Sequence, residues 1–419
     1  MAPRQIRPDQ IAEVLPPGGL TWLQACSGES PLIRDGIVTA GEALGAMTFT
    51  GIFVPGLNRV DYVLGSGRRV KTFFMTSELA CAPDQVEFLP LCYRDILAVL
   101  RATPIDAALL SVSPPDENGM CSFGPVVDFL VELWPKIPVR VAHINPQMPR
   151  TVGYHGVPFL ELTAFIQGET ELPVSAAGRD EVADKIGAMV AGLVPDGSTL
   201  QAGLGRIPET ALASLRNHRE LAIHSGLIGD SVVDLLQAGA LRARDPIAAG
   251  VAIGTRRLYD AISDKAFCFQ PASYTHSHRV LSRIDNLYTI NSAIEVDLFG
   301  QAFSELRPTG FVSGPGGASD FAAGARGGGG LRIVALPATA GRGITTRIVA
   351  PGKGSGPVSL GRFEIDVVAT EFGIADLRGK GYEGRAEALM AIAAPRHQAS
   401  LAMAWREWRG AAWRGADGQ

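Results

Sequence analysis

The chain has 419 residues, of which 46% are hydrophobic and 19% are charged. A chain of this length usually divides into two domains, and this composition excludes an intrinsically disordered protein. The net charge of −4, without long blocks of one sign, disfavours both a nucleic-acid partner and an anionic membrane surface.

The N-terminal segment and the cysteines indicate the compartment. Residues 1–19 lack the apolar stretch of a signal peptide, and the chain has no run of about 18 uncharged apolar residues, so we expect a cytoplasmic protein. The cysteines are odd in number and widely spaced, which favours buried reduced thiols over a disulfide framework or a zinc site. They are Cys26, Cys81, Cys92, Cys121 and Cys268.

Short β-rich runs alternate with helical runs along the whole chain, which predicts an α/β fold with largely parallel sheets. Residues 106–115 and 139–150 predict buried strands. Residues 180–197 predict a helix that Asp180 caps, with an apolar face of Val182, Ile186, Met189, Val190 and Leu193. We therefore expect two α/β domains, at residues 1–175 and 176–419.

The second half repeats one pattern of strand, glycine-bearing loop and helix, in residues 198–218, 221–239, 310–327 and 366–379. In open α/β sheets, ligands bind where such loops follow the carboxyl ends of strands. No loop completes a dinucleotide or P-loop fingerprint, because residues 203–208 break the glycine pattern at its last position. The loops predict a backbone-lined site for an anion or a carbonyl group.

The third of these loops contains Gly314, Gly316 and Gly317 just before a predicted helix start. Glycines let the backbone approach a ligand closely, and exposed N–H groups there would suit an oxyanion hole. The alternative is a tight turn followed by a flexible hairpin at Gly327–Gly330. Composition alone does not choose between these interpretations.

Two pairs of ionisable residues are candidates for general-base chemistry or metal binding. Glu295 and Asp297 lie two residues apart in a predicted strand, so both carboxylates share one face. That face could serve general-base chemistry, a subunit interface or solvent. His276 and His278 have a spacing that could hold a metal on a strand, but no third ligand is near. A solvated strand is the better interpretation, and we expect no metal.

Two further segments have polar or aromatic side chains. Residues 111–124 form a Pro-rich turn with Asp116, Glu117 and Asn118 at its tip, which favours a loop that lines a cleft. Residues 403–419 suggest a basic aromatic surface helix, although a frayed last helix and tail is the simpler interpretation.

Nine segments, taken together and in order, resemble the acetyl-CoA hydrolase/transferase family, a branch of the class I CoA-transferases that includes 4-hydroxybutyrate and acetate CoA-transferases. They span residues 106 to 395 approximately, and so long an ordered series is specific for the family. The segments are residues 113–124, 144–153, 196–212, 221–241, 254–260, 290–302, 313–325, 367–379 and 385–395.

The resemblance implies a two-domain, class I CoA-transferase-like fold of the NagB/RpiA type, in which acyl-CoA lies between the domains of a chain that commonly forms a homodimer. Coenzyme A would be bound as the acyl-CoA substrate, with a carboxylate or water as the second reactant. Gly203, Gly205 and Gly316 resemble the family's glycines around the thioester, with the Gly316 N–H in the oxyanion hole. This strengthens the oxyanion interpretation of residues 314–317.

The sequence departs from the family where a glutamate usually attacks the thioester. The family commonly has His-Ser-Glu at a corner between a strand and a helix, and this chain has His224, Ser225 and Gly226. Arg206 stands where the family usually has a small or apolar residue, and it could pair with a substrate carboxylate. The usual His-Pro-Asp ending is also replaced, by residues 392–398.

Three functions remain open. The first is cleavage of a CoA ester by water without a glutamyl-CoA intermediate, with Glu295, His224 or Asp230 as the group that activates water. The second is conventional acetyl-CoA hydrolysis or CoA transfer with a substitute carboxylate, for which Glu295 is the candidate. The third is a non-catalytic protein that binds CoA esters.

Overall fold

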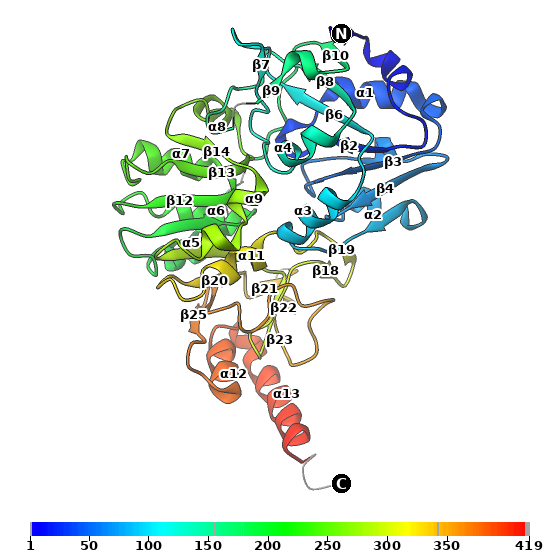
Figure 1. The fold of residues 1–419 in the computed structure, drawn as a ribbon. Helices are drawn as coiled ribbons and strands as arrows, with labels where there is room; N and C mark the ends of the chain where they lie inside the picture. Colours follow the sequence, from blue (N-terminus) through cyan, green and yellow to red (C-terminus); the bar gives the residue numbers. More distant parts are fainter. Residues whose placement is uncertain (1, 155, 177, 179, 342, 415–419) are drawn as a thin grey trace.

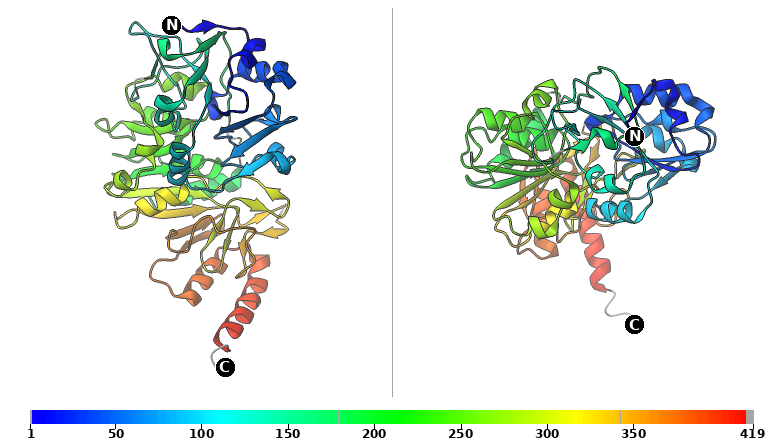
Figure 2. Two further views of the ribbon diagram at one scale, coloured as in Figure 1. Left: turned by 45° about the vertical axis from the view of Figure 1, so that its right-hand side comes forward. Right: turned by 45° about the horizontal axis from the view of Figure 1, so that its top comes forward.

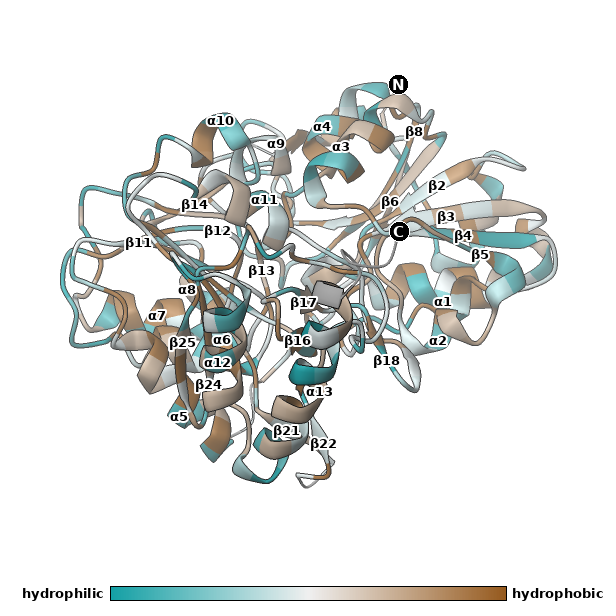
Figure 3. Cartoon of the chain, turned by 90° about the horizontal axis from the view of Figure 1, so that it is seen from below, coloured by the Kyte–Doolittle hydropathy of each residue, from teal (hydrophilic) through white to brown (hydrophobic). Residues whose placement is uncertain are grey.

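The computed structural model describes residues 2–154, 156–176, 178, 180–341 and 343–414. Two eight-stranded sheets organise the chain, and they lie on opposite sides of the molecule in Figures 1 and 3. The predicted α/β fold with largely parallel sheets is confirmed.

The first sheet is parallel throughout, in the order β1-β10-β8-β6-β2-β3-β4-β5. Its strands are β1 (Arg4–Gln5), β2 (Leu20–Leu23), β3 (Met47–Gly51), β4 (Arg68–Thr72), β5 (Val86–Phe88), β6 (Ala107–Val112), β8 (Val139–Ile144) and β10 (Ala164–Gln167). Every residue of β6 is buried, as expected of a strand that is covered on both faces.

The second sheet has the order β14-β13-β12-β11-β15-β20-β24-β25, and only its edge strand β25 is antiparallel. Its strands are β11 (Thr199–Ala202), β12 (Ala222–Ile228), β13 (Ile247–Ala252), β14 (Phe267–Phe269), β15 (Leu287–Ser292), β20 (Arg332–Ala335), β24 (Val367–Thr370) and β25 (Gly373–Asp376). The domain boundary predicted at residue 175 lies between the last strand of the first sheet and the first strand of the second.

Helices cover both sheets, and the short strands pair with one another in small sheets beside them. The helices are α1 (Pro31–Ala40), α2 (Ser77–Ala80), α3 (Tyr93–Ala102), α4 (Leu130–Leu133), α5 (Glu181–Ala191), α6 (Arg206–Ala213), α7 (Asp230–Gln237), α8 (Arg256–Ala261), α9 (Ala272–Thr275), α10 (His278–Leu281), α11 (Ala318–Gly324), α12 (Tyr382–Ala391) and α13 (Pro395–Arg414). The short strands are β7 (Met120–Cys121), β9 (Val157–Pro158), β16 (Glu295–Asp297), β17 (Ala302–Phe303), β18 (Leu306–Arg307), β19 (Gly310–Phe311), β21 (Thr339–Ala340), β22 (Thr345–Thr346) and β23 (Ile348–Val349).

One hydrophobic core joins the two sheets. It contains Trp22 and Val112 of the first sheet together with Ile228 and Val251 of the second, all of them buried. Continuous apolar packing of this kind resists separation of the two halves. The loops that follow the strands therefore meet along one fixed boundary, the seam between the two halves of the chain.

Helix α5 forms where its sequence predicts it, and Asp180 caps it by accepting hydrogen bonds from the N–H groups of Val182 and Ala183. Ile186 and Val190 are buried on its apolar face. Val182 was expected on that face but is exposed, because Ala183 points inward in its place.

Four predictions of secondary structure were wrong. The strand expected at residues 310–314 is only Gly310–Phe311, which pairs with β18 outside the two large sheets. Residues 374–379 were expected to form a helix, but Gly373–Asp376 is the edge strand β25. His276 and His278 were expected on a solvated strand, but they border the short helices α9 and α10, and His276 is buried. The strand that was expected to end at Ser225 continues through Gly226 to Ile228.

The C-terminal helix α13 extends away from the end of the molecule at which the N-terminus lies (Figures 1 and 2). Trp405 is buried and stacks on Trp408 at a centroid distance of 5.0 Å, and Phe299 packs edge-on against both rings. These contacts hold the helix as far as Trp408, whereas residues 415–419 of the expected tail lie outside the described residues.

All five thiols are free, but only Cys26 and Cys121 are buried. Cys92 and Cys268 are partly exposed and Cys81 is exposed, so the expected burial is wrong for these three. Within the described residues, no helix has both the length and the apolar character that a membrane span requires.

Candidate active site

A pocket of about 580 Å³ opens at the carboxyl ends of the central strands of the second sheet. The β11–β12 ladder pairs only Thr199–Leu200 with Ala222–Ile223, whereas β11 continues to pair with β15 as far as Ala202. Beyond the last β11–β12 pair, Gln201 and Gly226 line the pocket. The end of this ladder makes room for a ligand between two parallel strands.

Glycines from two loops line this pocket: Gly203, Gly205, Gly314, Gly316 and Gly317. Gly316 has a φ of +65°, a conformation that favours glycine, and it forms a parallel β-bridge with Cys92. A Cβ at Gly314 would lie 2.1 Å from the carbonyl oxygen of Phe73. The 314–317 loop is therefore held against the first half of the chain, close to the start of α3.

Gly226 lies in β12 with its open side toward the ring of His276. A Cβ built on Gly226 would lie 2.5 Å from Cε1 and 2.6 Å from Nε2 of His276. A Cβ on Gly317 would lie 2.5 Å from the same Nε2 atom. The imidazole thus fills the volume that a side chain at residue 226 or residue 317 would need.

Aromatic contacts hold the His276 ring in place. It stacks on Tyr93 at a centroid distance of 4.2 Å and packs against Phe321 at 4.8 Å. Its Nδ1 is 3.0 Å from Oγ1 of Thr275. Burial, followed by the nearby His224, lowers the pKa of His276 to about 3, so the ring is neutral at physiological pH.

The three residues predicted to activate water, His224, Asp230 and Glu295, do not line the pocket. Nε2 of His224 lies 3.1 Å from the carbonyl oxygen of Thr275, and burial lowers the pKa of this histidine. The Asp230 carboxylate accepts hydrogen bonds from the N–H and the hydroxyl of Thr255, at 2.8 and 2.7 Å.

Glu295 and Asp297 share one face of β16, as predicted, but both carboxylates are buried and serve local contacts. Glu295 accepts hydrogen bonds from the N–H and the hydroxyl of Ser355, at 2.8 and 3.2 Å. Asp297 accepts hydrogen bonds from Phe299 and Gln301 and so shapes the turn after the strand. Neither carboxylate faces solvent in this chain.

Three arginines line the pocket. Arg206 ion-pairs with the helix-capping Asp180 at 2.8 Å. Arg307 and Arg347 approach from the β18 and β23 region, and within the described residues neither side chain has an ion pair of 4 Å or less. Burial, followed by repulsion from Arg307, lowers the pKa of Arg347. Two neighbouring guanidinium groups favour an anionic ligand group at this end.

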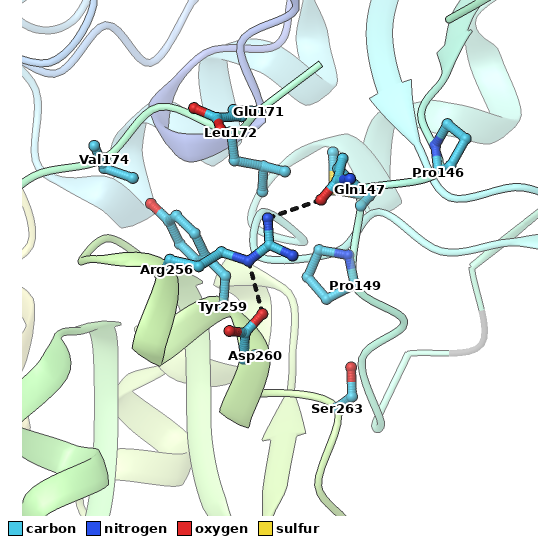
Figure 4. A pocket seen from close by; sticks show the side chains of 11 residues that line it. Pro146, Gln147, Pro149, Glu171, Leu172, Val174, Arg256, Tyr259, Asp260 and Ser263 are labelled. Carbon is cyan, nitrogen blue, oxygen red and sulfur yellow. Dashed lines mark hydrogen bonds and ion pairs between the residues drawn. The ribbon is translucent and has the colours of Figure 1, made fainter. Parts of the chain in front are cut away.

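A second pocket, of about 350 Å³, lies between residues 146–149, residues 171–174 and α8 (Figure 4). Arg256 crosses it and binds Gln147 at 2.7 Å and Asp260 at 2.8 Å. None of the glycine loops reaches this pocket, so it is separate from the candidate active site.

The loop with Asp116, Glu117 and Asn118 lines neither pocket, contrary to expectation. Asp116 accepts hydrogen bonds from the N–H groups of Asn118 and Met120 and ion-pairs with Arg150 at 2.7 Å. The loop is a turn that begins strand β7. Among the described residues, no cluster of three or more His, Cys, Asp or Glu side chains could hold a metal ion.

Sequence reasoning missed Tyr93, Phe321, Arg307 and Arg347 as pocket residues and considered His276 only as a metal ligand. Tyr93 lies far from the glycine loops in sequence, and no local pattern marks it. The pair of arginines was detectable only as cations close to a glycine-rich segment. Their convergence is a property of the fold.

Comparison with known proteins places this geometry in a family. The acetyl-CoA hydrolase/transferase C-terminal domain matches residues 254–405. The 4-hydroxybutyrate coenzyme A transferase of Clostridium kluyveri is 34% identical over 337 residues, which cover 77% of this chain and 79% of the relative. Relatives of this degree share the family as well as the fold.

Solved structures agree over nearly the full length. The 4-hydroxybutyrate CoA-transferase of Porphyromonas gingivalis superposes with a TM-score of 0.79 at 28% identity, covering 96% of this chain and 97% of that one. RipA from Yersinia pestis has the same fold, with a TM-score of 0.90 at 23% identity over 97% of this chain and 98% of that one. The fold is therefore class I CoA-transferase-like, and the chain belongs to the acetyl-CoA hydrolase/transferase family of enzymes that act on CoA thioesters.

Proposed function

We propose that this protein cleaves an acyl-CoA ester with water, without a glutamyl-CoA intermediate. The observation that carries the proposal is the position of Gly226, which lines the pocket without a side chain while His276 fills the adjoining volume. Among the described lining residues, Asp180 is the only carboxylate, and it is paired with Arg206. An anhydride intermediate needs a free carboxylate at the thioester.

In the proposed reaction the acyl-CoA lies along Gly203, Gly205, Gly314, Gly316 and Gly317, with Arg206 at the edge of the pocket. Water adds to the thioester carbonyl carbon, and the negative charge that develops on the carbonyl oxygen is stabilised by hydrogen-bond donors. The C–S bond then breaks and yields a carboxylic acid and the free thiol of coenzyme A. No other reactant is needed.

The proposed reaction also needs a group that takes the proton from the attacking water. Of the three residues named from the sequence, Glu295 is the one whose charge acts on a lining residue, because it counters the lowered pKa of Arg347. Its carboxylate is engaged by Ser355, so it would have to exchange that partner for water. His224 and Asp230 would act only through intervening groups.

Conventional CoA transfer is the second candidate, and Arg307 and Arg347 favour it. Two guanidinium groups lining the pocket would suit a carboxylate co-substrate. The C. kluyveri relative is named a CoA-transferase. In this reaction Glu295 would have to serve as the substitute nucleophile. Two further predictions from the sequence are untested: that the protein binds CoA esters without catalysis, and that it forms a homodimer.

One set of assays on the unmodified protein separates these functions. Release of free thiol from acetyl-CoA in water alone, with no adduct after borohydride or hydroxylamine treatment, is expected for hydrolysis. Exchange of labelled acetate into acetyl-CoA together with a glutamyl adduct would establish transfer and overturn the proposal. A rise in melting temperature with acyl-CoA but no turnover would leave only binding. A melting temperature that does not change with CoA or with any CoA ester would overturn all three functions: hydrolysis, transfer and binding.

A further inference from the structure

The imidazole of His276 lies between the two glycine-bearing segments of the pocket. It is 4% exposed, and its Nε2 atom lies beside Gly226 on one side and Gly317 on the other. Within the described residues, the only hydrogen bond of the ring joins Nδ1 to Thr275. Nε2 is therefore available to a ligand in the pocket.

The contacts of Thr275 allow the ring hydrogen of His276 on either nitrogen. The Thr275 hydroxyl lies 3.0 Å from Nδ1 of His276 and 3.4 Å from the carbonyl oxygen of Pro271. A hydroxyl has one hydrogen, so it either donates to Pro271 and accepts from Nδ1–H of His276, or donates to Nδ1 and leaves the 3.4 Å contact without a hydrogen bond. A carbonyl oxygen beside Nε2 would select the second arrangement. A neutral ring that accepts at Nδ1 has its hydrogen on Nε2.

We propose that His276 donates a hydrogen bond from Nε2 to the thioester carbonyl oxygen and is the side-chain donor of the oxyanion site. This rests on the proposed function, because it requires an acyl-CoA in the pocket. It holds equally for attack by water or by a carboxylate, since either attack places negative charge on that oxygen. No proton leaves the ring in this step.

The surroundings of the ring suit a neutral donor. The Tyr93 and Phe321 rings hold its plane, so no rotation is needed when the charge develops. Burial keeps the imidazole neutral and lowers its pKa to about 3, which makes it a poor base but leaves the Nε2–H donor intact. The carbonyl of Thr275 is in turn bound by His224, which fixes the segment that holds the ring.

Three variants test the proposal. His276→Leu removes the donor while filling most of the volume, His276→Gln keeps an amide donor, and His278→Leu makes the same change two residues away, at an exposed position. Loss of one oxyanion donor lowers kcat by about 100-fold or more. We expect that loss for His276→Leu with KM changed less than about threefold, partial recovery for His276→Gln, and no effect for His278→Leu.

The infrared band of the carbonyl of bound [1-13C]acetyl-CoA provides a readout that does not depend on turnover. In the unmodified protein the band should lie below its position in water, and in His276→Leu it should shift back. A folded His276→Leu variant with an unchanged band or unchanged kcat would overturn the proposal. If His276→Leu does not fold, the His276→Gln variant provides the test. A carbonyl band of the bound ester at the position of the free ester in that variant would overturn the proposal. A band unshifted in the unmodified complex overturns this inference alone, whereas no binding of any ester removes the proposed function and this inference with it.

Discussion

The ring of Tyr93 stacks on the imidazole of His276, with centroids 4.2 Å apart and planes inclined by 22°. Tyr93 begins helix α3 beside the first sheet, whereas His276 ends helix α9 in the second half of the chain. The neighbours of Tyr93 make two more contacts across the same seam, the Cys92–Gly316 bridge and a hydrogen bond from the Arg94 N–H to Asp320. The first residues of α3 thus fix one wall of the pocket.

This arrangement predicts that Tyr93→Leu lowers both stability and activity. The aromatic contact contributes about 1 kcal/mol beyond the burial of apolar area, and its loss frees the His276 ring. Tyr93→Phe keeps the stack and is the matched control. We expect a lower urea midpoint and a lower kcat for Tyr93→Leu, and near-normal values for Tyr93→Phe. Equal behaviour of the two variants would contradict a role for the stack.

Gly226 and His276 should be energetically coupled. Gly226→Ala places a Cβ about 2.5 Å from the imidazole, so we expect a loss of about 1–3 kcal/mol in the free energy of unfolding. In a His276→Ala background the same substitution meets open volume and should cost much less. Urea unfolding of the four proteins gives the coupling energy. Gly381→Ala, where a Cβ meets nothing within 4 Å, is the control. Additive effects would show that the imidazole does not occupy this volume in solution.

The repeated glycine loops made the sheet edge of the pocket predictable from the sequence. Parallel strands bring their carboxyl ends to one edge, so Gly203 and Gly226 had to lie near each other once the pattern of strand, loop and helix was recognised. Asp180 was identifiable as a cap because its side chain precedes a periodic apolar run. These features depend on short-range patterns.

His276 could not be placed in the same way, because the helices on either side of it have four residues each and show no apolar period. Its role depends on Tyr93, which lies far away in the sequence, and on a volume that becomes visible only when a Cβ is built on Gly226. Edge strand β25 was mistaken for a helix because a single short strand at the end of a sheet carries little alternation.

Two of the three arginines that line the pocket, Arg307 and Arg347, should determine which acyl groups bind. Arg347→Gln or Arg307→Gln is expected to weaken binding of succinyl-CoA by about 10- to 150-fold, because a charged hydrogen bond contributes about 1.5–3 kcal/mol. The acyl group of acetyl-CoA has no free carboxylate, so acetyl-CoA should lose less affinity. Calorimetric titration of both esters gives the comparison, with the exposed Arg279→Gln as the control. An equal loss for both esters would assign the arginines to the coenzyme A part instead.

Asp128 should make the protein less stable as pH rises. Its side chain is buried, Oδ1 has no hydrogen-bond partner among the described residues, and burial raises its pKa to about 8 from 3.8. Between these two values the folded state binds more protons than the unfolded state, so the free energy of unfolding falls as pH increases from about 4 to about 8.

Asp128→Asn cannot ionise and should remove this component, so the variant gains stability relative to the unmodified protein at pH 8 but not at pH 4. Urea unfolding at pH 4, 6 and 8 measures the difference between the two proteins, which cancels groups that titrate in both. Asp116→Asn is the control of opposite sign, because hydrogen bonds lower the pKa of that half-buried carboxylate and its contribution is lost only in acid. A difference between the Asp128→Asn variant and the unmodified protein that stays constant across this range would mean that Asp128 is ionised in the folded chain and has a partner in solution.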